Sequence, residues 1–134
     1  MTAPLAAAVV FDHTALLALG AGHRLLSGLV AAAHQEAGRH IYVPALCLAA
    51  ASADRPALGE HVGALPAMEV VELGYSAATM VGRLVAGAVD WRTAHAVVVA
   101  WPDAEWPTGR SVLTGHPDVY RRRGLTAIEL PPPR

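Results

Sequence analysis

Two ionisable side chains come directly after predicted strands and are the first candidates for chemistry. Asp12 ends the apolar run 6–11, and His116 follows the short run 111–114. Because the carboxyl ends of parallel strands meet at one edge of a sheet, both side chains are expected at that edge. A carboxylate binds hard cations such as Mg²⁺, whereas an imidazole favours zinc and other transition metals. Each also has a simpler interpretation: Asp12 as a cap of the next turn, and His116 as an exposed loop histidine.

Other reactive residue types have mainly structural interpretations. His95 lies among alanines and valines, so we predict a hydrogen-bonded core histidine. Cys47 has apolar neighbours and is expected to be a buried, reduced thiol. His34 and His40 are six residues apart, a spacing that does not place two ligands on one helical face, so no zinc motif is predicted.

Two further groups of residues leave two interpretations open. Arg121, Arg122 and Arg123 form the only basic concentration, which is either a solvated turn or a surface that contacts RNA phosphates. Trp101 and Trp106 flank an acidic loop, where they either pack against the domain or stack on bases.

The elements that must position these residues alternate between strand and helix. Short apolar runs predict strands at 6–11, 41–43, 69–73, 111–114 and 126–130. Helical spacing predicts helices at 14–19, 25–38, 44–51, 56–62, 76–85 and 91–100, with a short helical turn after Pro117. The expected helix caps are Thr14, Asp54 and Ser76. This alternation predicts an α/β fold with a central parallel sheet covered on both faces.

Length and composition limit the classes of function. The 134 residues suit one domain, predicted at 1–130, with a Pro-rich C-terminal tail at 131–134. Hydrophobic residues make up 54% of the chain and charged residues 16%, which is enough to build a packed core. A net charge of -1 provides no overall positive field, so any contact with nucleic acid must be local. The motifs of serine hydrolases, phosphate-loop proteins and dinucleotide-binding proteins are absent from the sequence.

The sequence also indicates a compartment. Its N-terminus lacks the basic segment of a secretory signal, and no run approaches the roughly 18–20 apolar residues that span a bilayer. Its single cysteine cannot form an internal disulfide. We therefore expect a cytoplasmic protein without a membrane partner.

Three segments resemble the PIN-domain family, in particular the VapC-type toxin ribonucleases of bacterial toxin–antitoxin pairs. They are residues 9–17, VVFDHTALL, residues 43–51, VPALCLAAA, and residues 94–96 leading to 112–118, VLTGHPD. The resemblance covers nearly the whole chain and implies a three-layer α/β/α domain. It also implies that three or four carboxylates hold Mg²⁺ or Mn²⁺, which activates a water to attack an RNA phosphodiester.

Carried over position by position, the resemblance retains only one family acid. Asp12 matches the first acid and is the candidate catalytic residue and metal ligand. The other family acids fall on Ala50, Thr93 and His116, so the acidic site is degenerate.

Two aspartates lie close enough in sequence to replace the missing acids. Asp90 precedes Thr93 by about one helical turn, and Asp118 follows His116 by two residues. The candidate metal ligands are therefore Asp12, Asp90, His116 and Asp118.

Two functions remain open. The first is a weakened ribonuclease that uses Mg²⁺ or Mn²⁺, binds RNA through Arg121, Arg122 and Arg123, and has a cognate antitoxin. The second is a non-catalytic PIN-fold module that dimerises or binds a partner. Loss of the acids removes the repulsion that demands a cation, so this site would be stable without a cofactor. Apolar helical faces at 25–33 and 81–85 predict a homodimer.

Overall fold

Five parallel strands form the centre of the fold in the computed structural model, which describes residues 7–131. They are β1 (Ala8–Phe11), β2 (His40–Pro44), β3 (Met68–Val71), β4 (Ser111–Thr114) and β5 (Ala127–Glu129). The strands pair in the order β3-β2-β1-β4-β5. In the middle of the sheet, Val10 of β1 lies opposite Tyr42 of β2 on one side and Val112 of β4 on the other.

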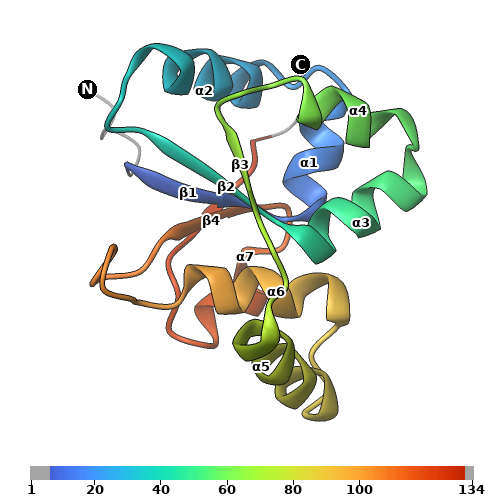
Figure 1. The fold of residues 1–134 in the computed structure, drawn as a ribbon, viewed down its shortest axis with the longest axis vertical. Coiled ribbons are helices and arrows are strands. Elements are labelled where there is room, and N and C mark those ends of the chain that lie inside the picture. The colour runs from blue at the N-terminus through green and yellow to red at the C-terminus, as the bar shows by residue number, and fades with distance from the viewer. Residues whose placement is uncertain (1–6, 132–134) are drawn as a thin grey trace.

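Seven helices surround this sheet in the described part of the chain. They are α1 (His13–Gly20), α2 (Arg24–Gln35), α3 (Ala45–Asp54), α4 (Ala57–Gly63), α5 (Tyr75–Ala86), α6 (Trp91–Ala100) and α7 (Pro117–Arg121). Figure 1 shows α1 and α2 on one side of the strands and α5 and α6 on the other. The predicted α/β class, with a central parallel sheet between two helical layers, is confirmed.

Burial explains the sequence of the central strands. Every residue of β1 is buried, and Val10 and Phe11 are fully inaccessible to solvent. A strand covered by helices on both faces has no solvent face, so it is a continuous apolar run rather than an alternating one. Helix α6 is buried almost all round because it packs against β1, β2 and β4 on one side and α5 on the other.

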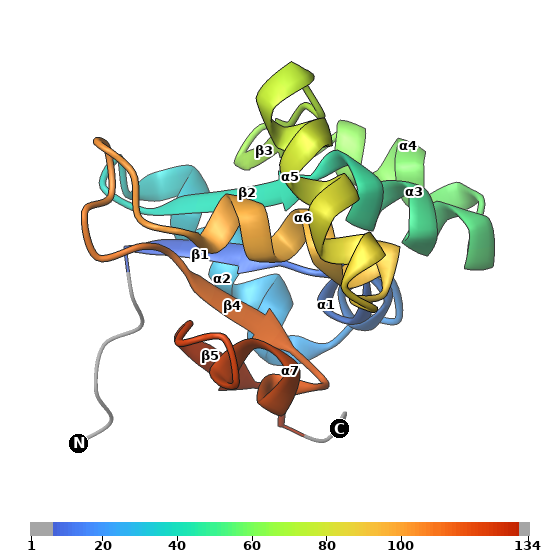
Figure 2. The same cartoon turned by 90° about the horizontal axis from the view of Figure 1, so that it is seen from below.

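The strand order creates a reversal point beside β1. The chain proceeds from β1 outward to β2 and β3, then returns to place β4 on the other side of β1. Figure 2 shows β5 and α7 on the side of the sheet away from β3 and α4. In open parallel sheets, ligands bind outside the carboxyl ends of strands at such a reversal. The loops after β1 and β4 are therefore the first place to look for a site.

Several predicted boundaries and caps are corrected by the structure. Asp12, not Thr14, is the N-cap of α1, and Gly74, not Ser76, precedes α5. Asp54 ends α3 instead of capping the next helix. Residues 1–6 of the predicted domain and 132–134 of the predicted tail lie outside the described residues. The first tail residue, Pro131, is held by a hydrogen bond that His23 Nε2 donates to its carbonyl oxygen at 2.9 Å.

Within residues 7–131, no single helix is long and apolar enough to cross a membrane. Helices α1 and α2 reach the required length and composition only as a pair, and they meet at a bend of 95°.

Candidate functional site

Asp12 lies at the carboxyl end of β1, and protein donors engage both of its carboxylate oxygens. Its Oδ1 accepts hydrogen bonds from the Thr14 hydroxyl at 2.6 Å and from the backbone N–H of Ala15 at 3.1 Å. Its Oδ2 accepts a hydrogen bond from the Tyr120 hydroxyl at 2.8 Å. Only 1% of the Asp12 surface is exposed. The carboxylate therefore caps α1 and also anchors α7.

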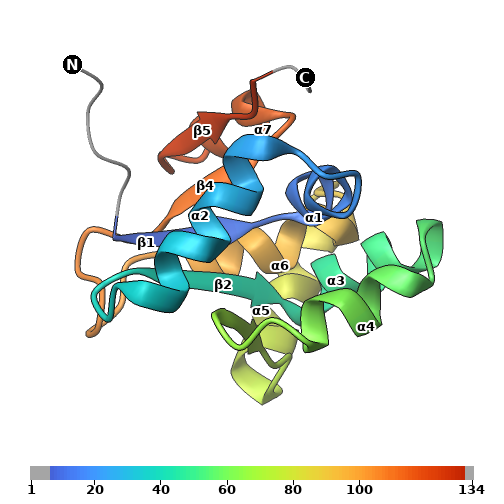
Figure 3. The same cartoon turned by 90° about the horizontal axis from the view of Figure 1, so that it is seen from above.

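Thr14 joins the two loops at the reversal point. Its hydroxyl donates to Asp12 and accepts a hydrogen bond from the backbone N–H of Gly115 at 2.8 Å. Gly115 directly follows β4, so this contact ties the β1–α1 loop to the β4–α7 loop. The second connection, between Asp12 and Tyr120, spans 108 residues of sequence. Figure 3 shows α1 at the end of β1, the edge of the sheet at which these two connections form.

Burial keeps the hydroxyl of Tyr120 and the thiol of Cys47 protonated around Asp12. Tyr120 is 1% exposed, and this burial, followed by the negative charge of Asp12, raises its phenolic pKa far above the usual range. Burial, again followed by the charge of Asp12, raises the pKa of the Cys47 thiol. The thiol donates to the backbone carbonyl oxygen of Arg92 at 3.3 Å. The predicted burial of Cys47 is confirmed, and neither group is poised to act as a nucleophile.

Two positions that the sequence resemblance pairs with acids, Ala50 and Thr93, do not supply charge to this centre. Ala50 is a buried residue of α3, with 7% of its surface exposed. Thr93 lies on α6, where its hydroxyl interacts with Tyr120 and opposes the rise in that residue's pKa. Position 93 therefore places a neutral group, not a carboxylate, beside Tyr120.

Asp90 is bound to a neighbouring arginine instead of being directed to a shared site. It is the N-cap of α6, and the Arg92 guanidinium contacts both of its carboxylate oxygens, from Nε at 3.0 Å and from Nη2 at 2.8 Å. These hydrogen bonds lower the pKa of Asp90 to about 2. A cation would have to compete with the guanidinium for this carboxylate.

His116 and Asp118 lie apart from this buried centre, on an exposed hollow of about 400 Å³. Arg121 and Glu129 complete its charged lining. The Arg121 Nη2 donates to the backbone carbonyl oxygen of Ala127 at 3.0 Å, which fixes this guanidinium against β5. In residues 7–131, none of the four charged or ionisable side chains of the hollow forms an ion pair.

The three consecutive arginines therefore differ in their surroundings. Arg121 lines the hollow, whereas Arg122 uses its Nε to donate to the Asp118 carbonyl oxygen at 3.2 Å. Arg123 is exposed. Of the predicted RNA-contacting triplet, only Arg121 shares a surface with His116 and Asp118.

The donor set does not fit a hard divalent cation. Among the described residues, no three His, Cys, Asp or Glu side chains are grouped so that they could hold a metal ion. Mg²⁺ needs near-octahedral oxygen ligands with room for several waters. Asp12 offers two oxygens that already accept hydrogen bonds from protein donors in a buried setting.

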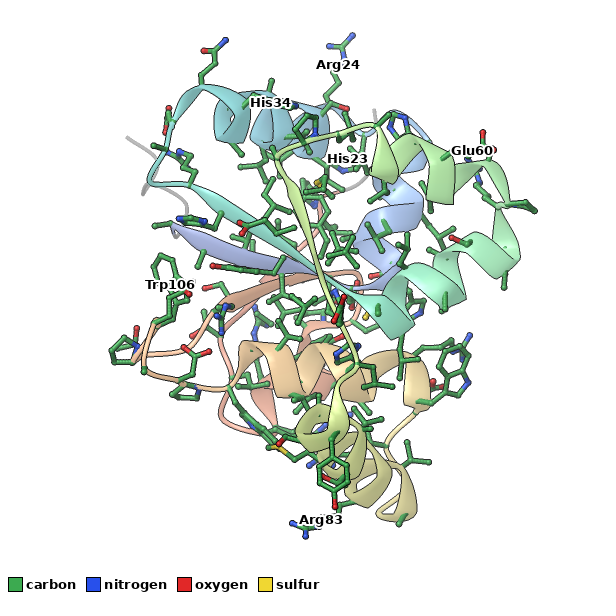
Figure 4. All side chains as sticks on the ribbon, in the orientation of Figure 1. His23, Arg24, His34, Glu60, Arg83 and Trp106 are labelled. Atoms are coloured by element: carbon green, nitrogen blue, oxygen red, sulfur yellow. The ribbon has the colours of Figure 1, made fainter. Side chains whose placement is uncertain are left out.

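Sequence reasoning placed several individual residues correctly. His95 is fully buried, and its Nδ1 accepts a hydrogen bond from the Leu46 N–H at 3.2 Å, as expected of a core histidine. Trp106, labelled in Figure 4, packs onto the domain by donating from Nε1 to the hydroxyl of Tyr42 at 2.9 Å and to Glu105 at 2.8 Å. The packing interpretation of Trp106 is thus confirmed.

Tyr120 was missed as a site residue. The sequence around it, Asp118-Val119-Tyr120, carries no motif, and its only signal is an aromatic residue on the inner side of a short helix after β4. A hydrogen bond between residues so distant in sequence cannot be read from local spacing. No family model matches the chain, and no curated protein is detectably similar to it in sequence.

Proposed function

We propose that this chain is a PIN-like domain that has lost metal-dependent phosphodiester cleavage and acts as a non-catalytic module that binds a second copy or another protein. The observation that carries the proposal is the state of Asp12, whose two carboxylate oxygens accept three hydrogen bonds from the chain itself while the residue is 1% exposed.

Electrostatics explains why such a closed site is stable. Several carboxylates within a few ångströms repel one another unless a cation neutralises them. Here the positions of the other acids carry Ala50, Thr93 and His116, so that repulsion is absent. The remaining charge on Asp12 is stabilised by hydroxyl and amide donors. Charged hydrogen bonds of this kind contribute about 1.5–3 kcal/mol each, which makes the hydroxyls an effective substitute for a metal ion.

The test measures RNA cleavage, metal binding and stability on the same variants. A labelled RNA pool is incubated in Mg²⁺ or Mn²⁺ with the wild-type protein, with Asp12→Asn and with the exposed control Asp54→Asn. We expect equal, background-level cleavage from all three proteins and no metal-dependent rise in melting temperature. Asp12→Asn should also be less stable in urea by about 1–3 kcal/mol, because the buried donors would lose their charged acceptor.

Ribonuclease activity is the second candidate function, because His116, Asp118 and Arg121 share a hollow beside the loop that is tied to Asp12. In this alternative, Asp12 with Asp90, His116 or Asp118 would bind Mg²⁺ or Mn²⁺, and Arg121, Arg122 and Arg123 would contact RNA. Cleavage by the wild-type protein that disappears in Asp12→Asn, together with metal-dependent stabilisation, would establish this alternative and reject the non-catalytic proposal.

The resemblance also implies protein partners for a non-catalytic module. A homodimer is the first, and a cognate antitoxin is the second. The exposed face of α5 is the surface proposed for the homodimer.

A further inference from the structure

We propose that the hollow lined by His116, Asp118, Arg121 and Glu129 binds a small zwitterion that carries both an ammonium and a carboxylate group, as a free amino acid does. This inference does not depend on the proposed function, because it concerns the exposed hollow and not the buried carboxylate of Asp12.

The position and size of the hollow suit a small ligand. Gly115 and His116 follow β4, and Glu129 ends β5, so the hollow lies at the carboxyl ends of two adjacent parallel strands. Ligands in open α/β sheets bind at this edge. The volume of about 400 Å³ lies within the roughly 300–1,000 Å³ of small-molecule sites.

The charges of the lining are of both signs and are not used within the fold. Asp118 and Glu129 supply two carboxylates, and Arg121 supplies a guanidinium. In the described part of the chain none of them is ion-paired. The bond from Arg121 to the Ala127 carbonyl holds the guanidinium in place, so less side-chain freedom is lost when an anion binds to its remaining N–H groups.

This charge pattern selects against the other simple ligands. Two carboxylates against one guanidinium place more acidic than permanently basic groups in the lining, which opposes a phosphate. A metal ion lacks a third ligand, because no metal-binding group of three occurs within residues 7–131. A zwitterion satisfies both signs: its carboxylate pairs with Arg121, and its ammonium pairs with Asp118 and Glu129.

The experiment is an NMR titration of the full chain with free L-amino acids, their N-acetyl derivatives and their methyl esters. Acetylation removes the ammonium charge, and esterification removes the carboxylate charge. We expect saturable shifts of the Gly115, His116 and Val119 amides at millimolar concentrations of at least one free amino acid. Each blocked derivative should bind about tenfold more weakly or worse, since one ion pair is lost.

Two variants separate the two halves of the site. Arg121→Met should weaken binding of the free amino acid and of its N-acetyl form but leave the methyl ester unchanged. Asp118→Asn should weaken the free amino acid and the ester but leave the N-acetyl form unchanged. Arg123→Met is the matched control and should bind as the wild type does, because Arg123 is exposed and does not line the hollow.

Two results would overturn the proposal. One is the absence of saturable shifts at these amides with every free amino acid. The other is equal binding of free and blocked forms, which would mean that charge recognition is not the basis of binding. If Arg121→Met disturbs the fold through its lost contact with Ala127, the Asp118→Asn comparison still decides between these outcomes.

Discussion

At the scale of single residues, the role of Asp12 depends on what its oxygens contact. An acid at the end of a central strand fits a metal ligand and a helix cap equally well in sequence. In the fold, Asp12 caps α1 through Ala15 and fastens α7 through Tyr120. The same carboxylate would bind a metal ion only if these donors were removed. Its hydrogen-bond partners, and not its residue type, therefore distinguish a structural acid from a metal ligand.

Tyr120→Phe tests the importance of this fastening. The variant retains the ring in the core but leaves Oδ2 of buried Asp12 without its hydroxyl donor. We expect a loss of about 1–3 kcal/mol in the free energy of unfolding, measured by urea denaturation. Tyr75→Phe is the matched control, because Tyr75 is 87% exposed and should lose almost nothing. Equal stability of the two variants would contradict a structural role for the hydroxyl.

His95 should make stability depend on pH. Burial lowers the pKa of its imidazole below the ordinary value of 6.5, and Nδ1 must stay unprotonated to accept from Leu46. The unfolded chain therefore binds a proton more readily than the folded protein. The contribution of His95 to stability is complete above about pH 6.5 and decreases as pH falls through the lower pKa of the folded state.

The variant His95→Asn measures this contribution, since an amide oxygen can accept from Leu46 without titrating. Urea denaturation between about pH 5 and pH 8 should show a shallower loss of stability at acid pH in the variant than in the wild type. His34→Gln alters an exposed histidine, labelled in Figure 4, and should retain the wild-type slope. An unchanged slope in His95→Asn would exclude His95 as its source.

At the scale of elements, the loop between α6 and β4 requires a glycine for a steric reason. Gly109 has φ +81, and a Cβ at this position would lie 2.6 Å from the carbonyl oxygen of Ala100. The next residue, Arg110, donates its N–H to that same oxygen at 3.0 Å. The loop therefore closes onto the end of α6 only when position 109 lacks a side chain.

Gly109→Ala should destabilise the protein more than Gly124→Ala. Both glycines have positive φ, at +81 and +78, so both variants incur about 1–2 kcal/mol of backbone strain. A Cβ at Gly124 meets nothing within 4 Å, so the difference between the variants isolates the clash with Ala100. Urea denaturation of both proteins measures it. A smaller effect at position 109 would show that the loop relaxes without cost.

Elements whose sequence patterns lie within a few neighbouring residues could be predicted. Strand β1 and helix α6 were predicted because one is a short apolar run and the other is an apolar helix ended by Pro102. The caps were less predictable, because Asp12, Thr14, Asp54 and Ser76 all have suitable side chains. Choosing among them requires the angle at which the chain leaves the sheet, which tertiary packing determines.

At the scale of the whole molecule, strand order determines which candidate residues meet. Because β1 and β4 are neighbours, Thr14 reaches Gly115 and Asp12 reaches Tyr120. Sequence patterning placed Asp12 and His116 at this edge of the sheet. It could not show that Tyr120 donates to the buried Asp12 while His116 lines an exposed hollow, since that division depends on the orientation of α7.

The exposed face of α5 is the best surface for the proposed homodimer. Of the two predicted faces, the first is largely used inside the fold, where Leu26, Leu29 and Val30 are buried. In α5 only Val81 is buried, whereas Tyr75 is 87% and Val85 42% exposed. Arg83, which Figure 4 shows pointing away from the domain, is the only charged residue of this helix. Two copies of such a face could meet with little charge repulsion or desolvation of charge.

Val85→Glu should therefore shift a dimer to monomer, because a charge would be buried at the centre of an apolar contact. Light scattering coupled to size-exclusion chromatography measures the mass of each protein over a range of concentrations. Leu25→Glu is the matched control: Leu25 is 38% exposed on α2, and its substitution should leave the dimer intact. A reversed pattern would assign the interface to α2, and a monomeric wild type at high concentration would reject the homodimer.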